Sequence, residues 1–241
     1  MTLTALLACG QDAKEPSVVK EEASVVLNSS PKVVAVSPSV NQSTLPAQTT
    51  PSVQRYQICV DAPATPLTPE IRAEQRSWVD RTISMSHTSR IAAVVVDKAG
   101  YALHVYNNGK RTRSYPIQLG LDPVYDKVMS GDCRTPEGVY RIIGKRQPPR
   151  TAYTHSLLLD YPNFHDYAQF MTMRHQTRQL SLDEKIGDSI AIHGGGEEGR
   201  GDSSEGWNWT KGCVALSDEN IKDLTSRVRV GTPVVIVRTL K

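Results

Sequence analysis

The chain has 241 residues, long enough for one sizeable hydrophobic core, and a formal net charge of +3 from 28 Lys+Arg and 25 Asp+Glu. This near balance, without a long basic run interleaved with aromatic residues, argues against nucleic acid as a partner. No apolar run approaches the roughly 20 residues of a membrane-spanning helix, so an integral membrane protein is not expected.

The N-terminal stretch, MTLTALLACG, places a short apolar segment directly before Cys9. Such a segment, ending in small residues and a cysteine, is typical of a lipoprotein signal, although this one is short and lacks a basic start. We interpret residues 1–9 as a partial signal in which Cys9 is the lipidated residue. Residues 10–54 are rich in Ser, Thr, Pro and Val and predict a disordered linker, which leaves residues 55–241 as the folded domain.

The first element of this domain is a predicted helix over residues 68–86. Thr68 is a suitable N-cap, because its hydroxyl can accept a hydrogen bond from the first turn and a proline follows it. Three apolar side chains of this helix, Ile71, Trp78 and Ile83, are expected to turn toward the core.

Strands dominate the remainder of the domain. Runs of β-branched or alternating apolar residues predict strands at 90–98, 101–108, 111–120, 138–146, 155–161, 188–194, 211–217 and 232–238. Two more helices are predicted, one over residues 164–180 and a short one that Ser217 caps. The chain is therefore expected to be mainly β with peripheral helices.

One histidine and one cysteine, His193 and Cys213, stand about twenty residues apart, each beside a glycine. A metal site would need more ligands at close spacing, so no metal is expected. The pair taken alone also fits two unrelated core residues on buried strands. As a catalytic couple, the histidine would act as base for the thiol and nearby backbone amides would bind an oxyanion. The long, glycine-rich, acidic loop 194–208 between them is typical of a flap over a cleft.

These segments resemble the L,D-transpeptidase catalytic domain family, in which a His-Gly pair is followed by Ser/Thr-x-Gly-Cys and an apolar strand. Here IHG contains His193 and WTKGCVALSDENI contains Cys213. Two upstream segments, GDCRTPEGVYRI and SLLLDYPN, are similar to further blocks of the family. The resemblance spans roughly residues 91–238.

The resemblance implies a β-sandwich or partly open barrel with an active-site groove, and no cofactor. Cys213 would attack a carbonyl of a peptidoglycan stem peptide and form a thioester, which then passes to an amine acceptor. His193 would be the general base and acid, and the Gly212 amide would bind the oxyanion. The residues expected to contact substrate are Gly194, Thr210, Lys211, Trp209, Tyr161, Thr135 and Glu137.

The segment GCVALS departs from many members, because Lys211 and Ala215 stand where these carry histidine and arginine. It is more similar to a subgroup that acts on links between murein and lipoprotein. A murein-linked lipoprotein is therefore a further expected partner. Two alternatives remain open: an L,D-carboxypeptidase, endopeptidase or amidase that releases such a lipoprotein, and a non-catalytic murein-binding module. The implied location is the cell envelope or periplasm, with a lipid anchor as the contact with the membrane.

The four cysteines fit an envelope setting. With Cys9 lipidated and Cys213 catalytic, Cys59 and Cys133 remain, and an oxidising compartment would allow them to form a disulfide. The sequence leaves open whether these two residues meet in space.

Overall fold

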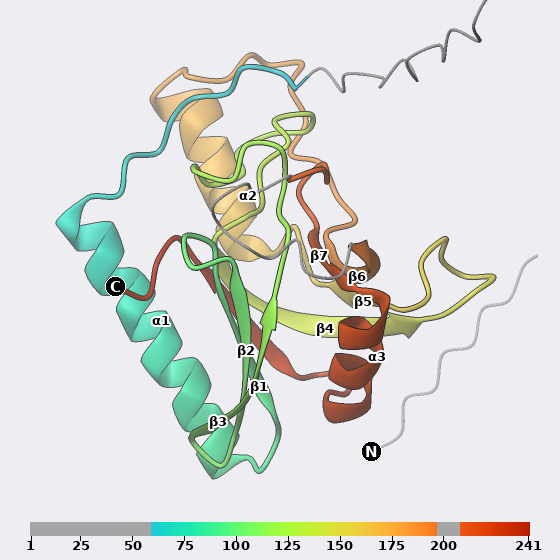
Figure 1. The fold of residues 1–241 in the computed structure, drawn as a ribbon. Coiled ribbons are helices and arrows are strands. Elements are labelled where there is room, and N and C mark those ends of the chain that lie inside the picture. The colour runs from blue at the N-terminus through green and yellow to red at the C-terminus, as the bar shows by residue number, and fades with distance from the viewer. Residues whose placement is uncertain (1–58, 197–207) are drawn as a thin grey trace, which may run out of the picture. The chain divides into compact units, whose positions relative to one another are not determined.

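A computed structural model describes residues 59–196 and 208–241 of the chain (Figure 1). The predicted signal with Cys9, the predicted linker 10–54 and the middle of the loop 194–208 lie outside these residues. Within the described ranges, no helix combines the length and the apolar character needed to cross a membrane.

In the described part of the chain, one eight-stranded mixed sheet organises the domain, in the order β3-β2-β1-β8-β4-β5-β6-β7 (Figure 1). The strands are β1 (Ala93–Asp97), β2 (Ala102–Asn107), β3 (Lys110–Pro116), β4 (Gly138–Arg146), β5 (Ser156–Leu159), β6 (Ala191–Gly196), β7 (Val214–Ser217) and β8 (Pro233–Val237). Neighbours are antiparallel except for β1 with β8 and β6 with β7, which are parallel.

The two edges of this sheet meet beside β7. The segment that follows β3 pairs there, with Gln118 opposite Ala215 and Gly120 opposite Thr210. The sheet is therefore a nearly closed barrel, and the prediction of a mainly β domain with a few helices is confirmed.

The central strands β1 and β8 are buried on both faces, which explains their continuous apolar sequences. Successive side chains point to opposite faces of a strand, so Val94 and Ile236 enter the main core. Val95 and Val235 face the other way, into a smaller cluster with Val79 of helix α1 (Pro69–Thr88). Helix α3 (Asp218–Arg227) packs against β6 and β7.

Helix α1 turns the predicted face to the sheet and buries polar side chains there as well. Trp78 and Ile83 are half-buried and pack against the cluster of Val79, Val95, Val235 and Val237, as predicted. Ile71 is also half-buried, and the side chains that the helix buries fully are Gln75, Val79, Thr82 and Ser86. Gln75 is accommodated by a hydrogen bond from its Nε2 to Glu137 Oε2 (2.7 Å). Periodicity of apolar residues could not reveal it, because a buried glutamine needs a partner from elsewhere in the fold.

Two predicted elements are shorter than expected. The strand predicted over 111–120 ends at Pro116, because proline has no N–H to continue the ladder. The helix predicted over 164–180 divides into α2 (Phe164–Met171) and a π-helical turn, η1 (Thr172–Gln176). The chain then leaves the helix and buries Leu180 in a small apolar cluster with Phe170.

Candidate active site

Strands β6 and β7 bring His193 and Cys213 to neighbouring positions. The two strands pair in parallel, with Ile192 opposite Val214 and His193 opposite Ala215. Cys213 directly precedes β7, so two residues separated by a long loop lie on adjacent strands at the same end of the pair. Among the described residues outside disulfides, Cys213 is the free cysteine, and it is partly exposed.

The environment of His193 fixes its tautomer and its charge. Its Nδ1 lies 2.6 Å from the carbonyl oxygen of Gly194. A carbonyl can only accept, so Nδ1 carries the proton and Nε2 keeps a lone pair for use as a base. Burial lowers the pKa of the imidazole, and the hydrogen bond to Gly194 offsets part of this effect. His193 is therefore neutral at pH 7.

Two aromatic side chains hold the imidazole ring. Tyr153, from the loop between β4 and β5, stacks on His193 with ring centroids 3.7 Å apart and planes 13° apart. Trp209 meets the same ring edge-on at 5.6 Å, and its Nε1 donates to Gln118 Oε1 (2.8 Å). Burial raises the pKa of Tyr153, and so would the negative charge of Cys213 in its thiolate form. Trp209 was expected at the site, whereas Tyr153 was not.

The thiol of Cys213 rests in its neutral form. Its Sγ donates to the carbonyl oxygen of Ser189 at 3.8 Å. Burial raises the pKa of the thiol, while a hydrogen bond with the Ala191 backbone and the positive charge of Lys127 act in the opposite direction. A neutral thiol beside a neutral imidazole needs a proton transfer before it can act as a nucleophile.

Residues 210–213, which end in the cysteine, form a tight turn, which we call the nucleophile turn after the role that we propose for Cys213. Thr210 Oγ1 donates to the carbonyl of Cys213 (2.7 Å) and accepts from the amide of Gly212 (3.2 Å). The φ of Gly212 is +134°, and a Cβ there would lie 2.5 Å from the carbonyl oxygen of Arg134, so only glycine fits. The Gly212 amide, expected to bind an oxyanion, is directed at Thr210 and would first have to release this bond. Lys211 is exposed on the same turn.

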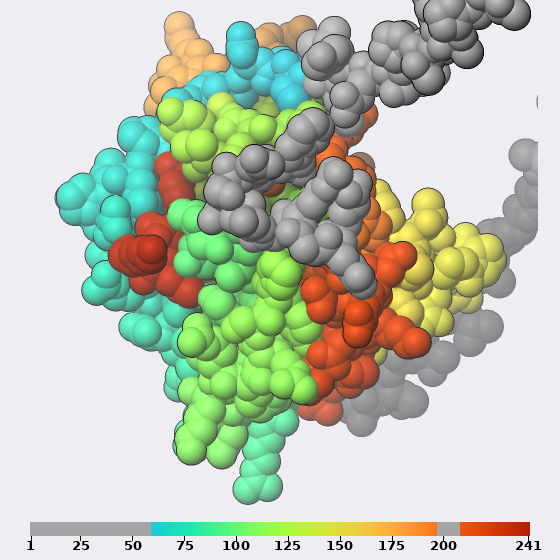
Figure 2. All heavy atoms as spheres, in the orientation of Figure 1, coloured from blue at the N-terminus to red at the C-terminus, as the bar shows by residue number. Residues whose placement is uncertain are grey.

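Helix α3 braces the end of β6 next to His193. Asp218 Oδ1 accepts from the amide of Gly195 (2.9 Å) and from Thr154 Oγ1 (2.8 Å). Gly194 is buried in this contact, where a Cβ would lie 2.7 Å from Thr154 Oγ1. Figure 2 shows the β4–β5 loop, drawn in yellow, bordering the orange-red surface of α3. Gly194 therefore acts through close packing, and Asp218 holds the turn whose carbonyl orients His193.

We expect Asp218→Ala to slow acylation of Cys213 by about tenfold, because two donors lose their acceptor and the Gly194 carbonyl can shift. Asp218→Asn keeps an acceptor oxygen and should recover most of the rate. The measurement is the acylation rate of Cys213 together with the melting temperature. Glu219→Ala, at the neighbouring exposed position, is the matched control. Equal rates in wild type and Asp218→Ala would show that the hydrogen bonds of Asp218 do not affect the orientation of His193.

Glu137 was expected to contact substrate, and the structure places it in the interior. Its carboxylate pairs with Lys98 Nζ (2.8 Å) and with Arg238 Nε (2.8 Å), at 3% exposure of the Glu137 side chain. Burial and the charge of Glu137 raise the pKa of the adjacent Asp126 to about 7. Glu137 is thus paired inside the scaffold with two cations, and its contact with substrate stays a prediction.

Thr135 and Tyr161 also lie in the interior. Thr135 Oγ1 accepts from the amide of Gly120 (3.1 Å), and Tyr161 donates its hydroxyl proton to the carbonyl of Ile186 (3.0 Å). Both side chains are buried. Their polar atoms are already bonded inside the fold, and contact of these residues with substrate stays a prediction.

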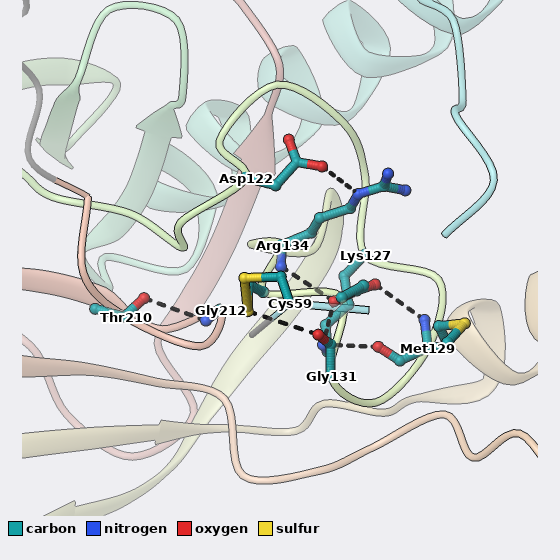
Figure 3. Close-up of a disulfide and its surroundings, with 10 residues drawn as sticks. Cys59, Asp122, Lys127, Met129, Gly131, Arg134, Thr210 and Gly212 are labelled. Atoms are coloured by element: carbon teal, nitrogen blue, oxygen red, sulfur yellow. Dashed lines mark hydrogen bonds and ion pairs between the residues drawn. A yellow bond between two sulfur atoms is a disulfide. The ribbon is translucent and has the colours of Figure 1, made fainter. Parts of the chain in front are cut away.

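The two remaining cysteines of the described chain meet in space. Cys59 and Cys133 form a disulfide with Cα atoms 5.6 Å apart, next to the nucleophile turn (Figure 3). No group of three or more His, Cys, Asp or Glu side chains that could hold a metal ion occurs among residues 59–196 and 208–241.

Four residues near the pair were not predicted for the site: Tyr153, Ser189, Asp218 and Lys127. For Asp218 the sequence does carry a signal, because this residue directly follows Ser217, which ends β7 and caps α3. The other three lie on segments that only folding brings to the thiol.

A free cysteine beside a buried, neutral histidine on a barrel-like sheet is typical of a thiol-dependent enzyme. Residues 91–236 match the YkuD family, the L,D-transpeptidase catalytic domain. This match covers more than half of the chain, and the chain belongs to that family. No curated protein sequence matches the chain.

Several solved structures are similar to the chain. Bdellovibrio bacteriovorus Bd1075 is 23% identical with a TM-score of 0.44, over 62% of this chain and 49% of its own. The helical cell shape determining protein Pgp2 from Campylobacter jejuni is 24% identical with a TM-score of 0.47, over 69% and 57%. An L,D-transpeptidase from Mycobacterium smegmatis is 16% identical with a TM-score of 0.38, over 61% and 58%. The chain thus spans about half to three fifths of the length of these proteins.

Proposed function

We propose that this protein is a cysteine acyltransferase of the L,D-transpeptidase type that acts on peptidoglycan stem peptides. The observation that carries the proposal is the oriented, neutral His193, with Nε2 unprotonated, on the strand beside the free thiol of Cys213. Membership of the L,D-transpeptidase catalytic domain family supports the same chemistry.

In the proposed reaction, the thiol of Cys213 leaves its contact with Ser189 and transfers its proton to Nε2 of His193. The sulfur then bonds to the carbonyl carbon of the third stem residue. Backbone amides of the nucleophile turn stabilise the oxyanion, with Gly212 exchanging its bond to Thr210 for the new acceptor. Collapse of the intermediate breaks the peptide bond, and His193 returns the proton to the departing D-residue.

The thioester that remains is transferred in the second half of the reaction. His193 accepts a proton from the incoming amine, which attacks the thioester and frees the thiol of Cys213. Water in place of the amine gives hydrolysis from the same intermediate. A lipid anchor at Cys9, followed by the predicted linker 10–54, would hold this domain in the cell envelope within reach of murein and of murein-linked lipoprotein.

The decisive experiment incubates the purified protein with muropeptides that carry tetrapeptide stems, with and without an added amine acceptor. We expect cross-linked or amine-exchanged products by mass spectrometry, and an adduct of a carbapenem on Cys213. Shortened stems in place of exchanged products would identify a carboxypeptidase, and release of a linked lipoprotein would identify an amidase or endopeptidase. Murein binding without any adduct on Cys213 would refute the proposal in favour of a binding module.

A further inference from the structure

The Cys59–Cys133 disulfide lies next to Gly212 of the nucleophile turn, because Arg134, which follows Cys133, contacts that glycine (Figure 3). It fastens the start of the described domain to the segment 131–134, and the amide of Val60 donates to the carbonyl of Gly131 (2.9 Å) beside it. Two residues of this segment are connected to the nucleophile turn through their backbone carbonyls, Arg134 directly and Cys133 by way of Gly120.

Arg134 makes the first connection. Its carbonyl oxygen lies against the Cα of Gly212, in the space that any Cβ would fill. Its side chain is held by Asp122 Oδ2 (2.7 Å) and by the carbonyls of Pro63 (2.7 Å) and Ala62 (2.9 Å). The position of the Arg134 backbone therefore depends on Ala62 and Pro63, which follow shortly after Cys59 in the chain.

Cys133 makes the second connection. Its carbonyl accepts from the amide of Asp122 (3.2 Å) and lies so close to Gly120 that a Cβ there would clash. Gly120 forms a bridge with Thr210. Thr210 Oγ1 in turn holds both the Gly212 amide and the Cys213 carbonyl. One half of the disulfide is thus joined to Cys213 by a short series of contacts, in which backbone groups and the Thr210 hydroxyl take part.

A buried ion pair belongs to the same segment. Asp132 is fully buried and accepts from Lys127 Nζ (2.7 Å). It also accepts from the amides of Val128 (2.8 Å), Met129 (3.0 Å) and Arg134 (3.0 Å). The cation held in this way is the one whose charge favours the thiolate of Cys213. Loosening of residues 131–134 would therefore change both the shape of the turn and the charge near the sulfur.

We propose that the Cys59–Cys133 disulfide is a positioning element of the active site, which sets the reactivity of Cys213 by holding residues 131–134 against the nucleophile turn. The proposal rests on Cys213 as the nucleophile of the proposed function. Reduction of the disulfide by a dithiol takes up two electrons and two protons, breaks the S–S bond, leaves two thiols and converts the dithiol to its own disulfide. In the reduced protein the turn loses this support and Cys213 reacts more slowly.

The test is the rate of iodoacetamide labelling of Cys213 against pH, quantified on the Cys213 peptide by mass spectrometry. The full chain is compared with its Cys59→Ala/Cys133→Ala variant. We expect labelling of the variant at pH 7 to be about tenfold slower, with its pH profile displaced upward, because small displacements at a reacting centre have large kinetic effects. A folded variant with the wild-type rate and pH profile, or with faster labelling, would overturn the proposal.

Val235→Ala is the control variant for an effect of lower stability alone. It opens a cavity between the sheet and α1, away from the nucleophile turn. This variant should melt earlier than wild type and keep the wild-type pH profile at Cys213. If it shows the same displacement as the disulfide variant, the effect is general and the proposal fails. If the double variant does not fold, wild type reduced with dithiothreitol replaces it, with the same expected and contrary outcomes.

The outcome is separable from the proposed function, since labelling needs no peptidoglycan. A wild-type protein that shows the displacement on reduction but yields no muropeptide product would keep this inference and lose the acyltransferase assignment.

Discussion

The Cys213→Ala protein should form no carbapenem adduct and should lose muropeptide turnover by at least about 10⁴-fold, as expected when a covalent nucleophile is removed. The methyl group replaces a small side chain at the start of β7, so we expect the free energy of unfolding to change by less than about 1 kcal/mol. Turnover of a defined tetrapeptide muropeptide and the melting temperature are the two measurements.

Cys213→Ser is the matched variant, because it keeps an atom at the position of Sγ while its proton is much harder to remove. It should fold like wild type and also be inactive, since a hydroxyl is far less acidic than a thiol and the lowered pKa of His193 makes this histidine a weaker base. If Cys213→Ala folds normally and retains wild-type turnover, no thioester forms at Cys213 and the proposed mechanism is wrong.

Removal of the imidazole should move the pH at which Cys213 becomes reactive. In wild type, His193 can take the thiol proton wherever it is neutral, and burial lowers its pKa, so labelling by iodoacetamide should already be substantial below pH 7. In His193→Ala the thiol must ionise unaided. Because burial also raises the pKa of Cys213, labelling should rise only above about pH 8.5 and be at least about tenfold slower at pH 7.

His175→Ala serves as the control, since His175 is exposed on η1 and should leave the profile unchanged. The buffered range should extend from pH 5 to pH 10, with the label on Cys213 resolved from any label on other cysteines. Superimposable profiles for wild type and His193→Ala would mean that the histidine does not tune the thiol. It would then be a core residue of β6 that stacks on Tyr153.

Local sequence determined most of the elements of this protein. The caps at Thr68 and Ser217 accept from the first turns of α1 and α3, as their short hydroxyl side chains predicted. The β-branched runs of β1 and β8 indicated strands buried on both faces, and the glycines beside His193 and Cys213 marked places where chain segments approach closely. These features depend on side chains within a few residues of one another, so they can be read without the fold.

The tertiary structure decided what surrounds the candidate pair. Tyr153 reaches His193 from another loop, the polar face of α1 docks through Gln75, and Glu137 turns inward to Lys98. Each of these contacts joins residues far apart in sequence and depends on strand register and loop course, which leave no local periodicity. The same reason explains the place of the Cys59–Cys133 disulfide. Two cysteines 74 residues apart can be counted in a sequence, but only the folded backbone shows that they meet next to the nucleophile turn.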